Sequence, residues 1–168
     1  SASSAGGLFS EPQQVTLTSN GAPIYYTTDG SAPTSSSQRY TAAFTLDNDT
    51  TLQAVAINSA GQTSSTLLLT FRFDFDPPTN FALEANTLVI DVANENAFTL
   101  TIANGELAAS FAIEINDADG FTQAISLSGQ INNADEQVLS ADLSSMADGD
   151  VTAVLSLTDV AGNASVPF

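Results

Sequence analysis

The chain has 168 residues, 43% of them aliphatic or aromatic, and its nineteen acidic residues against two arginines and no lysine give a net charge of −17. This apolar content is enough to build packed cores, whereas the charge disfavours nucleic-acid binding because it repels phosphate groups. The lack of histidine and cysteine excludes Ser-His-Asp and Cys-His nucleophile systems, ordinary zinc sites and disulfides, and no apolar run approaches the roughly 20 residues that a membrane helix needs.

The first half of the chain has the pattern of short strands separated by turns. Residues 1–7 are small and polar, and we expect them to be a disordered linker. Alternating apolar residues, or enrichment in β-branched and aromatic ones, predict strands over residues 14–18, 24–28, 40–46, 50–57 and 66–73. Residue types typical of tight turns occur at 20–21, 29–31, 47–49 and 59–62.

The second half repeats this plan at a larger scale. Strands are predicted over residues 88–92, 97–102, 108–115, 121–127, 137–143 and 151–158, with a short last strand after a turn at 159–163. Further turns are predicted at 104–105, 116–120 and 148–150. Because turn signals recur about every ten residues and no helical period is present, the chain is predicted to be all-β. The predicted architecture is two tandem antiparallel β-sandwich domains of the Ig or fibronectin III type, residues 1–75 and 76–168.

The joint between the two predicted domains is the stretch from Phe71 to Pro78, FRFDFDPP. It carries Asp74 and Asp76 two residues apart, and the two prolines stiffen its exit. Residues 1–76 hold six acids and two arginines, whereas residues 77–168 hold thirteen acids and no base. A solvated acidic surface explains this charge without any ligand, and divalent cations are the natural alternative partners.

Both halves resemble known families. The stretches GLFSEPQQVTL, IYYTTDGSAPTSSSQRY and TTLQAVAINSAGQTS cover nearly all of residues 6–73 and resemble the chitobiase/hexosaminidase C-terminal type module, an appendage of secreted bacterial proteins. Residues 76–168, with DPP, DADG, and ADGD paired with TDVAGN, look like the bacterial Ig-like repeats of large surface (RTX-type) adhesins, although that family's entry usually reads DTTAP. The resemblance implies a mechanical role, in which such modules carry an adhesive end away from a cell and calcium commonly stiffens their joints.

Sandwich topology predicts which acidic loops meet at the joint. The end of the first domain's last strand should lie with the turns at residues 29–31 and 47–49, and the second domain should contribute its loops after residues 104 and 158. Ca²⁺ takes six to eight oxygen ligands, including carboxylates from short loops. We therefore predict a Ca²⁺ site at the joint, with candidate ligands Asp47, Asp49, Asp74, Asp76, Glu106, Asp159 and Asn163. The alternative is that Asp74 and Asp76 only keep a linker soluble and Asp159 only forms a turn.

A second acidic cluster is predicted at the far end of the second domain. Its candidate metal ligands Asp117 and Asp119 should share this end with Asp148 and Asp150. Crowded like charges cost energy unless a cation or water separates them, and a following module would complete a joint there. In the first domain Asn58 takes the place of Asp159, and the lost charge weakens the case for metal at that end.

Carbohydrate binding is the alternative from another class, because secreted hydrolases carry appendages like the first half. Tyr25, Tyr26 and Tyr40 could offer aromatic faces, but the chain has no tryptophan. One of the two adjacent tyrosines should also point into the core, since side chains alternate along a strand. Paired carboxylates, as in glycosidases, are compatible with so many acids, but the chain has no large insertion to build a cleft around them.

The sequence thus predicts a non-catalytic, Ca²⁺-stiffened spacer of a large secreted or cell-surface bacterial adhesin, located outside the cell or on its surface. The expected partners are neighbouring modules of the same chain and a cell-surface or polysaccharide ligand. Nucleic acid and membrane insertion are not expected, and the chain is expected to be a monomer. The alternative function is an accessory carbohydrate-binding or linker segment of a secreted polysaccharide-degrading enzyme.

Overall fold

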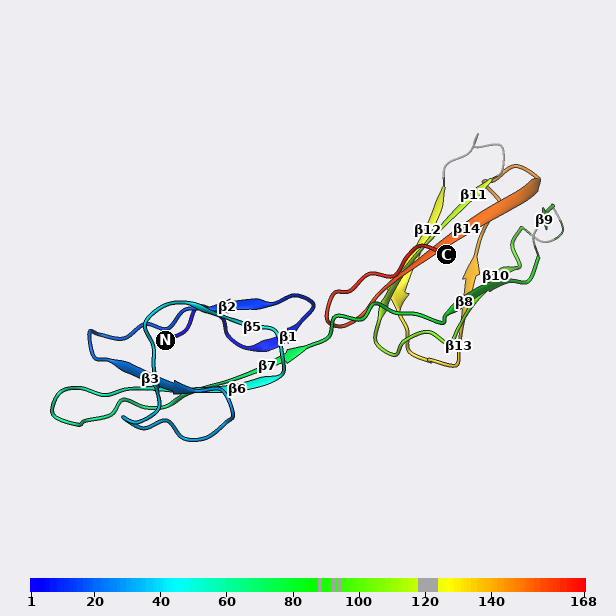
Figure 1. Cartoon of the computed structure of the whole chain (residues 1–168). Helices are drawn as coiled ribbons and strands as arrows, with labels where there is room; N and C mark the ends of the chain where they lie inside the picture. Colours follow the sequence, from blue (N-terminus) through cyan, green and yellow to red (C-terminus); the bar gives the residue numbers. More distant parts are fainter. Residues whose placement is uncertain (88, 92, 94, 118–123) are drawn as a thin grey trace. The chain divides into compact units, whose positions relative to one another are not determined.

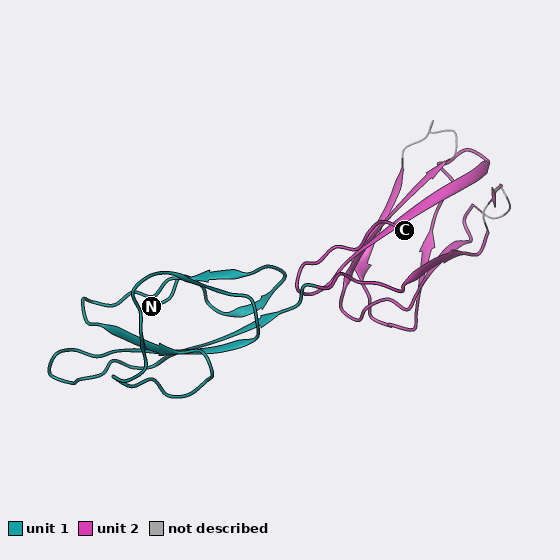
Figure 2. Cartoon of the chain, in the orientation of Figure 1, with its two compact units in different colours: residues 1–75 teal, residues 76–168 magenta. Residues whose placement is uncertain are grey.

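The computed structural model describes every residue of the chain except 88, 92, 94 and 118–123. The described residues form strands and no helix, which confirms the predicted all-β class (Figure 1). They divide into two compact units, unit 1 (Ser1–Phe75) and unit 2 (Asp76–Phe168), each of which is a β-sandwich (Figure 2). In this described part of the chain, nothing has the form of an apolar helix long enough to cross a membrane.

Unit 1 is built from a larger and a smaller sheet. The larger sheet has the strand order β1-β7-β6-β3-β4, and the smaller sheet pairs β2 with β5. All of these strand pairs are antiparallel except β1 with β7. The strands are β1 (Gly7–Phe9), β2 (Gln13–Val15), β3 (Ile24–Thr27), β4 (Gln38–Arg39), β5 (Phe44–Leu46), β6 (Thr50–Ala56) and β7 (Leu67–Phe73).

The core of unit 1 is supplied by both sheets. Val15 from the smaller sheet and Leu52 and Phe71 from the larger one are fully buried. Tyr26 is also buried, and its ring stacks on that of Phe44 with the ring centroids 4.7 Å apart. This confirms that one of the two adjacent tyrosines points into the core, as the alternation of side chains along a strand requires.

The N-terminal residues are part of the fold, so the prediction that residues 1–7 are disordered is wrong. The amine of Ser1 donates to the carbonyl oxygen of Thr18 at 2.8 Å, and β1 pairs in parallel with β7. Gly6 has a φ of 75°, and a Cβ at this position would lie 2.7 Å from the carbonyl oxygen of Thr70. The absence of a side chain at Gly6 therefore permits the close approach of the N-terminal segment to β7.

The sequence predicts a single strand over residues 40–46, but the two ends of this segment pair with different sheets. The amide of Tyr40, just after β4, donates to the carbonyl oxygen of Ile24 in β3 at 2.9 Å. The chain then crosses to the smaller sheet, where Phe44 of β5 lies opposite Val15 of β2. Tyr40 and Phe44 pack against the same core, so the apolar pattern is continuous although the sheet changes.

Unit 2 also has two sheets, and all of its described strand pairs are antiparallel. One sheet has the order β13-β10-β8 and the other β12-β11-β14-β9. The strands are β8 (Ala82–Ala85), β9 (Val89–Ile90), β10 (Phe98–Ala103), β11 (Ser110–Asp117), β12 (Ile125–Gln130), β13 (Glu136–Ala141) and β14 (Gly149–Thr158).

Unit 2 differs from the predicted pattern in two places. The sequence does not predict β8, because its four residues, ALEA, are poor in β-branched and aromatic types. The short last strand is present as a bridge between Thr158 and Ala164 and as two hydrogen bonds between Leu155 and Phe168. The strands predicted over 88–92 and 121–127 and the turn predicted at 116–120 lie partly outside the described residues.

The core of unit 2 is built from the inward faces of its two sheets. Leu100 of β10, Ile113 of β11 and Leu155 of β14 are fully buried. Gly129 of β12 lies opposite Phe111 of β11, and a Cβ on this glycine would lie 2.9 Å from the aromatic ring. The ring therefore covers a position where only glycine fits without displacement.

The buried ring of Phe71 should contribute much of the stability of unit 1. We expect Phe71→Ala to lower the free energy of unfolding of unit 1 by about 3–5 kcal/mol, because it removes the largest apolar group that β7 buries. Amide hydrogen exchange of β6 and β7 measures this loss. Leu68→Ala on the same strand is the matched control, since its side chain is 60% exposed, and it should change stability by less than about 0.5 kcal/mol. Equal losses in the two variants would contradict the packing described.

Candidate functional site

Asp49, a predicted Ca²⁺ ligand, lies in the turn before β6 and contacts the end of β7. Its Oδ1 accepts a hydrogen bond from the amide of Phe73 at 2.8 Å. Its Oδ2 lies 3.8 Å from Nη1 of Arg72, and both of these side chains are largely exposed. Asp49 therefore ties the turn before β6 to the C-terminal end of β7.

Two further predicted ligands, Asp47 and Asp74, lie in the segments next to these strand ends. Asp47 Oδ1 accepts a hydrogen bond from Nδ2 of Asn48 at 2.5 Å. The amide of Asp74 donates to the carbonyl oxygen of Phe9 at 3.0 Å, which extends the pairing of β1 with β7 by one residue. Unit 1 thus gathers Asp47, Asp49 and Asp74 around the same strand ends, as its topology predicts, but engages them in local hydrogen bonds.

The turn at Asp29 is held by its own side chain. Asp29 Oδ1 accepts hydrogen bonds from the amide of Ser31 at 2.9 Å and from the hydroxyl of Ser31 at 2.6 Å. The hydroxyl hydrogen bond contributes most to lowering the pKa of this carboxyl, followed by the amide. Asp29 also forms a bridge with Thr51, so this turn lies beside the start of β6.

In unit 2, the predicted ligands Asp159 and Asn163 bind each other. Asp159 is buried, and its Oδ1 accepts hydrogen bonds from the amides of Gly162 at 2.7 Å and Asn163 at 2.8 Å. Its Oδ2 accepts a hydrogen bond from Nδ2 of Asn163 at 2.8 Å. Burial raises the pKa of this carboxyl, but the hydrogen bonds from the Asn163 side chain and from nearby amides outweigh burial and lower the pKa below its usual value.

Unit 1 has the same turn after β6, with Asn58 in the place of Asp159. Asn58 Oδ1 accepts hydrogen bonds from the amides of Ala60 and Gln62, both at 3.0 Å, and its Nδ2 donates to Oε1 of Gln62 at 2.9 Å. The backbone hydrogen bond that closes each turn is 3.0 Å long, from Asn58 to Gln62 and from Asp159 to Asn163. The shared geometry identifies Asp159 as a turn-forming group that an asparagine can replace.

The remaining candidates for the joint site are exposed. Glu106 lies in the loop before β11, and Asp76 is the first residue of unit 2. Ser110 at the start of β11 pairs with Thr158, which precedes Asp159. The loop that carries Glu106 and the turn that carries Asp159 therefore lie at the same end of unit 2.

The second acidic cluster is partly described. Asp117 is buried at the end of β11, where it lies opposite Val151 of β14. Val151 directly follows Asp150, so the turn that carries Asp148 and Asp150 lies at the same end of unit 2 as Asp117. Asp119 lies outside the described residues.

No set of three or more acidic side chains in the described part of the chain lies close enough together to hold a metal ion. Ca²⁺ needs six to eight oxygen ligands. The carboxylates of Asp49 and Asp159 instead accept hydrogen bonds that hold turns within their own units. These carboxylates have a structural role, and the Ca²⁺ site stays a prediction.

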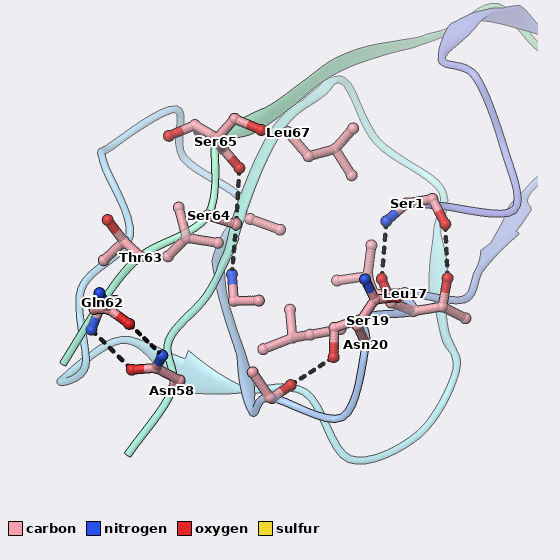
Figure 3. A pocket seen from close by; sticks show the side chains of 17 residues that line it. Ser1, Leu17, Ser19, Asn20, Asn58, Gln62, Thr63, Ser64, Ser65 and Leu67 are labelled. Atoms are coloured by element: carbon pink, nitrogen blue, oxygen red, sulfur yellow. Dashed lines mark hydrogen bonds between the residues drawn. The ribbon is translucent and has the colours of Figure 1, made fainter. Parts of the chain in front are cut away.

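Unit 1 has a hollow of about 570 Å³ that the sequence analysis does not predict (Figure 3). Residues 17–20 after β2 and residues 54–67 of the β6–β7 hairpin supply most of its lining. Figure 3 shows the hydrogen bonds between Asn58 and Gln62 in its wall. The lining contains many hydroxyl and amide groups but no acidic or aromatic side chain from the described residues. The hollow can therefore offer hydrogen bonds to an uncharged polar ligand, and its sequence signal is the run TSST at residues 63–66.

Two of the three tyrosines that could serve as sugar-stacking faces pack against Phe44. Tyr26 stacks on its ring, and Tyr40 lies edge-on to it with the ring centroids 6.3 Å apart. Tyr26 is also buried. Tyr26 and Tyr40 thus help to pack the core of unit 1.

Comparison with known proteins identifies the class of unit 1. Residues 4–68 match the family of the chitobiase/beta-hexosaminidase C-terminal domain, which confirms the resemblance stated for the first half of the chain. This match lies wholly within unit 1. No curated protein matches the chain.

Solved structures similar to the chain include the following three. A tetra-tandem repeat in the extending region of a large adhesion protein is 18% identical, with a TM-score of 0.46, and the match covers 100% of this chain but only 46% of that one. Two cytokine receptor complexes are 11% and 9% identical, with TM-scores of 0.37 and 0.35. Those matches cover 98% and 96% of this chain and 98% and 89% of the others. All three TM-scores lie below 0.5.

The turn after β14 should need a side-chain oxygen at residue 159 as hydrogen-bond acceptor, but it should not need the negative charge of the carboxylate. We expect Asp159→Ala to lower the free energy of unfolding of unit 2 by roughly 1–3 kcal/mol, because amide donors in the turn lose their acceptor. Asp159→Asn should lose clearly less, since Asn58 closes the same turn in unit 1. Hydrogen exchange of β14 measures both variants. If Asn and Ala destabilised equally, the turn-forming role would be refuted.

The lowered pKa of Asp159 should make the stability of unit 2 depend on pH. Because the folded pKa lies below the unfolded value of about 3.9, the stabilisation from the ionised carboxylate is complete above that value and is lost as the pH falls through the folded pKa. The difference in unfolding free energy between the unmodified chain and Asp159→Asn should therefore shrink on acidification. Urea unfolding at several pH values checks this, and Asn58→Ala is the non-titrating control whose effect should stay constant.

Proposed function

We propose that the chain is a non-catalytic spacer segment of a large secreted or cell-surface bacterial protein. The observation that supports this most directly is the use of the same polar turn in both units. The pairs Asn58 with Gln62 and Asp159 with Asn163 close a hairpin within their own sandwich. The side chains of these four residues thus hold short loops in one conformation. In an enzyme, such polar groups would instead surround a substrate.

The family match of unit 1 supports a modular role. The name of this family describes a C-terminal domain of chitobiase and beta-hexosaminidase, and such a domain is attached to other domains of the same protein. Each unit of this chain also has its own hydrophobic core. These properties suit a module whose task is to connect its neighbours.

Calcium is the second part of the proposal. Its support is electrostatic, because nineteen acidic residues face only two arginines and a divalent cation would relieve their repulsion. Asp49 and Asp159 already accept hydrogen bonds in their turns. The test begins with Asp76, because it is a predicted ligand at the joint and is exposed.

Calorimetric titration of the whole chain with Ca²⁺ tests this part. We expect a saturable heat and a higher melting temperature, and we expect Asp76→Ala to reduce both. Glu114→Ala is the matched control, since Glu114 is an exposed acid on β11 and is not a predicted ligand. A chain that shows neither heat nor a melting shift would remove Ca²⁺ from the proposal and leave the spacer role in place.

Carbohydrate binding is the second candidate function, and the hollow in unit 1 favours it. Its hydroxyl and amide lining suits an uncharged, hydroxyl-rich ligand, and the family name refers to chitobiase and beta-hexosaminidase, which are named as sugar-cleaving enzymes. None of the described residues that line the hollow is aromatic, and stacking on aromatic faces is a usual source of affinity in small-molecule sites. The spacer role therefore remains the first proposal.

Retention on insoluble chitin and a glycan array separate the two candidate functions. We expect no retention above that of an unrelated acidic protein. If retention is observed, Ser65→Phe should abolish it by filling the hollow, because Ser65 is part of the lining. Ser35→Phe, in an exposed loop that does not line the hollow, is the matched control. Retention that only Ser65→Phe removes would replace the spacer role by sugar binding.

A further inference from the structure

The chain contains the dipeptide Asn-Gly twice, once in each unit. Asn20-Gly21 lies between β2 and β3 in unit 1, and Asn104-Gly105 follows β10 in unit 2. In this dipeptide the backbone nitrogen of the glycine can attack the side-chain carbonyl carbon of the asparagine, because no Cβ on the glycine shields its nitrogen. The structure places the two dipeptides in different environments, so their reactivity should differ.

The dipeptide in unit 1 is open to its surroundings. Asn20 and Gly21 are both exposed. Gly21 has a φ of 92°, and a Cβ built on it would have no heavy atom within 4 Å. Among the described residues, none accepts a hydrogen bond from the amide of Gly21. The nitrogen of Gly21 is therefore accessible to the side chain of Asn20, and the backbone around it has room to rearrange.

The dipeptide in unit 2 is packed into its domain. Gly105 is buried, and a Cβ on it would lie 3.2 Å from side-chain atoms of Ile131, which is itself only 1% exposed. The amide of Asn104 donates to the carbonyl oxygen of Asp135 at 3.3 Å, and the amide of Ala108 donates to that of Ile131 at 2.9 Å. Rearrangement of the backbone at Asn104 and Gly105 therefore requires a local opening of unit 2.

We propose that Asn20 is a site of spontaneous covalent modification in the folded chain and that Asn104 is protected from the same reaction. The nitrogen of Gly21 loses its proton and forms a bond to Cγ of Asn20, and the bond from Cγ to Nδ2 breaks, so that Nδ2 leaves as ammonia. Water then opens the resulting cyclic imide at either of its two carbonyl carbons. The product is isoaspartate or aspartate at residue 20, and no atom is oxidised or reduced. This reaction depends neither on the spacer role nor on carbohydrate binding.

The modification changes the hollow of unit 1. Asn20 is part of its lining (Figure 3), and none of the described lining residues is acidic. Either product adds a negative charge at this position. Isoaspartate also routes the main chain through the former side chain and so lengthens it between Ser19 and Ala22, where Oγ of Ser19 donates to the carbonyl oxygen of Ala22 at 2.5 Å. A chain that has aged in water therefore has a different hollow from a new one.

Incubation of the complete chain at neutral pH in heavy-oxygen water tests the proposal, because the new carboxylate takes up an oxygen from the solvent. Trypsin cuts after Arg39, and Asn20 is the only asparagine in residues 1–39, so the mass of this peptide reports its conversion. Tandem mass spectrometry of a second digest reports the conversion of Asn104. We expect Asn20 to react at least about tenfold faster than Asn104 in the folded chain, since Asn104 must await a local opening. In urea the two rates should be similar, because each asparagine is followed by glycine.

Two glycine variants separate attack by the neighbouring nitrogen from direct attack by water. Gly21→Ala should slow the reaction of Asn20 severalfold in the folded chain and also in urea, so this outcome does not depend on how well the variant folds. Gly61→Ala is the matched control, since Gly61 also has a positive φ, 78°, and open space around it, but follows Ala60. This control should leave the rate at Asn20 unchanged.

Three results would overturn the proposal. If Asn20 stays unmodified in the folded chain, the site does not exist. If Asn20 and Asn104 react equally fast in the folded chain, the packing of Gly105 against Ile131 gives no protection. If Gly21→Ala does not slow the reaction, the nitrogen of residue 21 is not the attacking group.

Discussion

The polar turn that follows β6 in unit 1 and β14 in unit 2 is the interaction on which each sandwich depends. An oxygen of Asn58 in unit 1, and of Asp159 in unit 2, accepts two amide hydrogen bonds and fixes where the chain reverses. Because side chains alternate along a strand, a slip of one residue in the pairing that follows would turn Phe71 out of the core and Leu68 into it. Both units therefore need a turn of one defined length, and both build it with the same geometry.

The strongly negative charge is carried by a fold that does not depend on ion pairs. The ion pair between Asp49 and Arg72 is exposed, and pairs of this kind contribute little to stability. Hydrogen bonds within the turns lower the pKa of Asp29, Asp142 and Asp159 instead. Backbone amides and hydroxyl groups thus stabilise the ionised carboxylates in place of basic side chains, which explains how compact units form with two arginines and no lysine.

Strand edges matter for a module that connects others. In unit 1, β6 pairs with β7 from Leu67 to Phe71, and β1 pairs with the outer edge of β7 from Phe71 to Phe73.

The sequence by itself determined the all-β class, most strand positions and the family of residues 4–68, because these follow from local alternation and turn residues. It did not reveal β1, since parallel pairing with β7 joins the two ends of unit 1 and depends on the bare backbone at Gly6. Nor did it reveal that the chain changes sheet within residues 40–46. Tyr40 before the change and Phe44 after it pack against the same core, so the apolar pattern is not interrupted. Only the tertiary structure decided what the carboxylate of Asp159 contacts, since the same side chain can bind a cation or an amide, and the choice depends on which N–H groups the folded turn brings within reach.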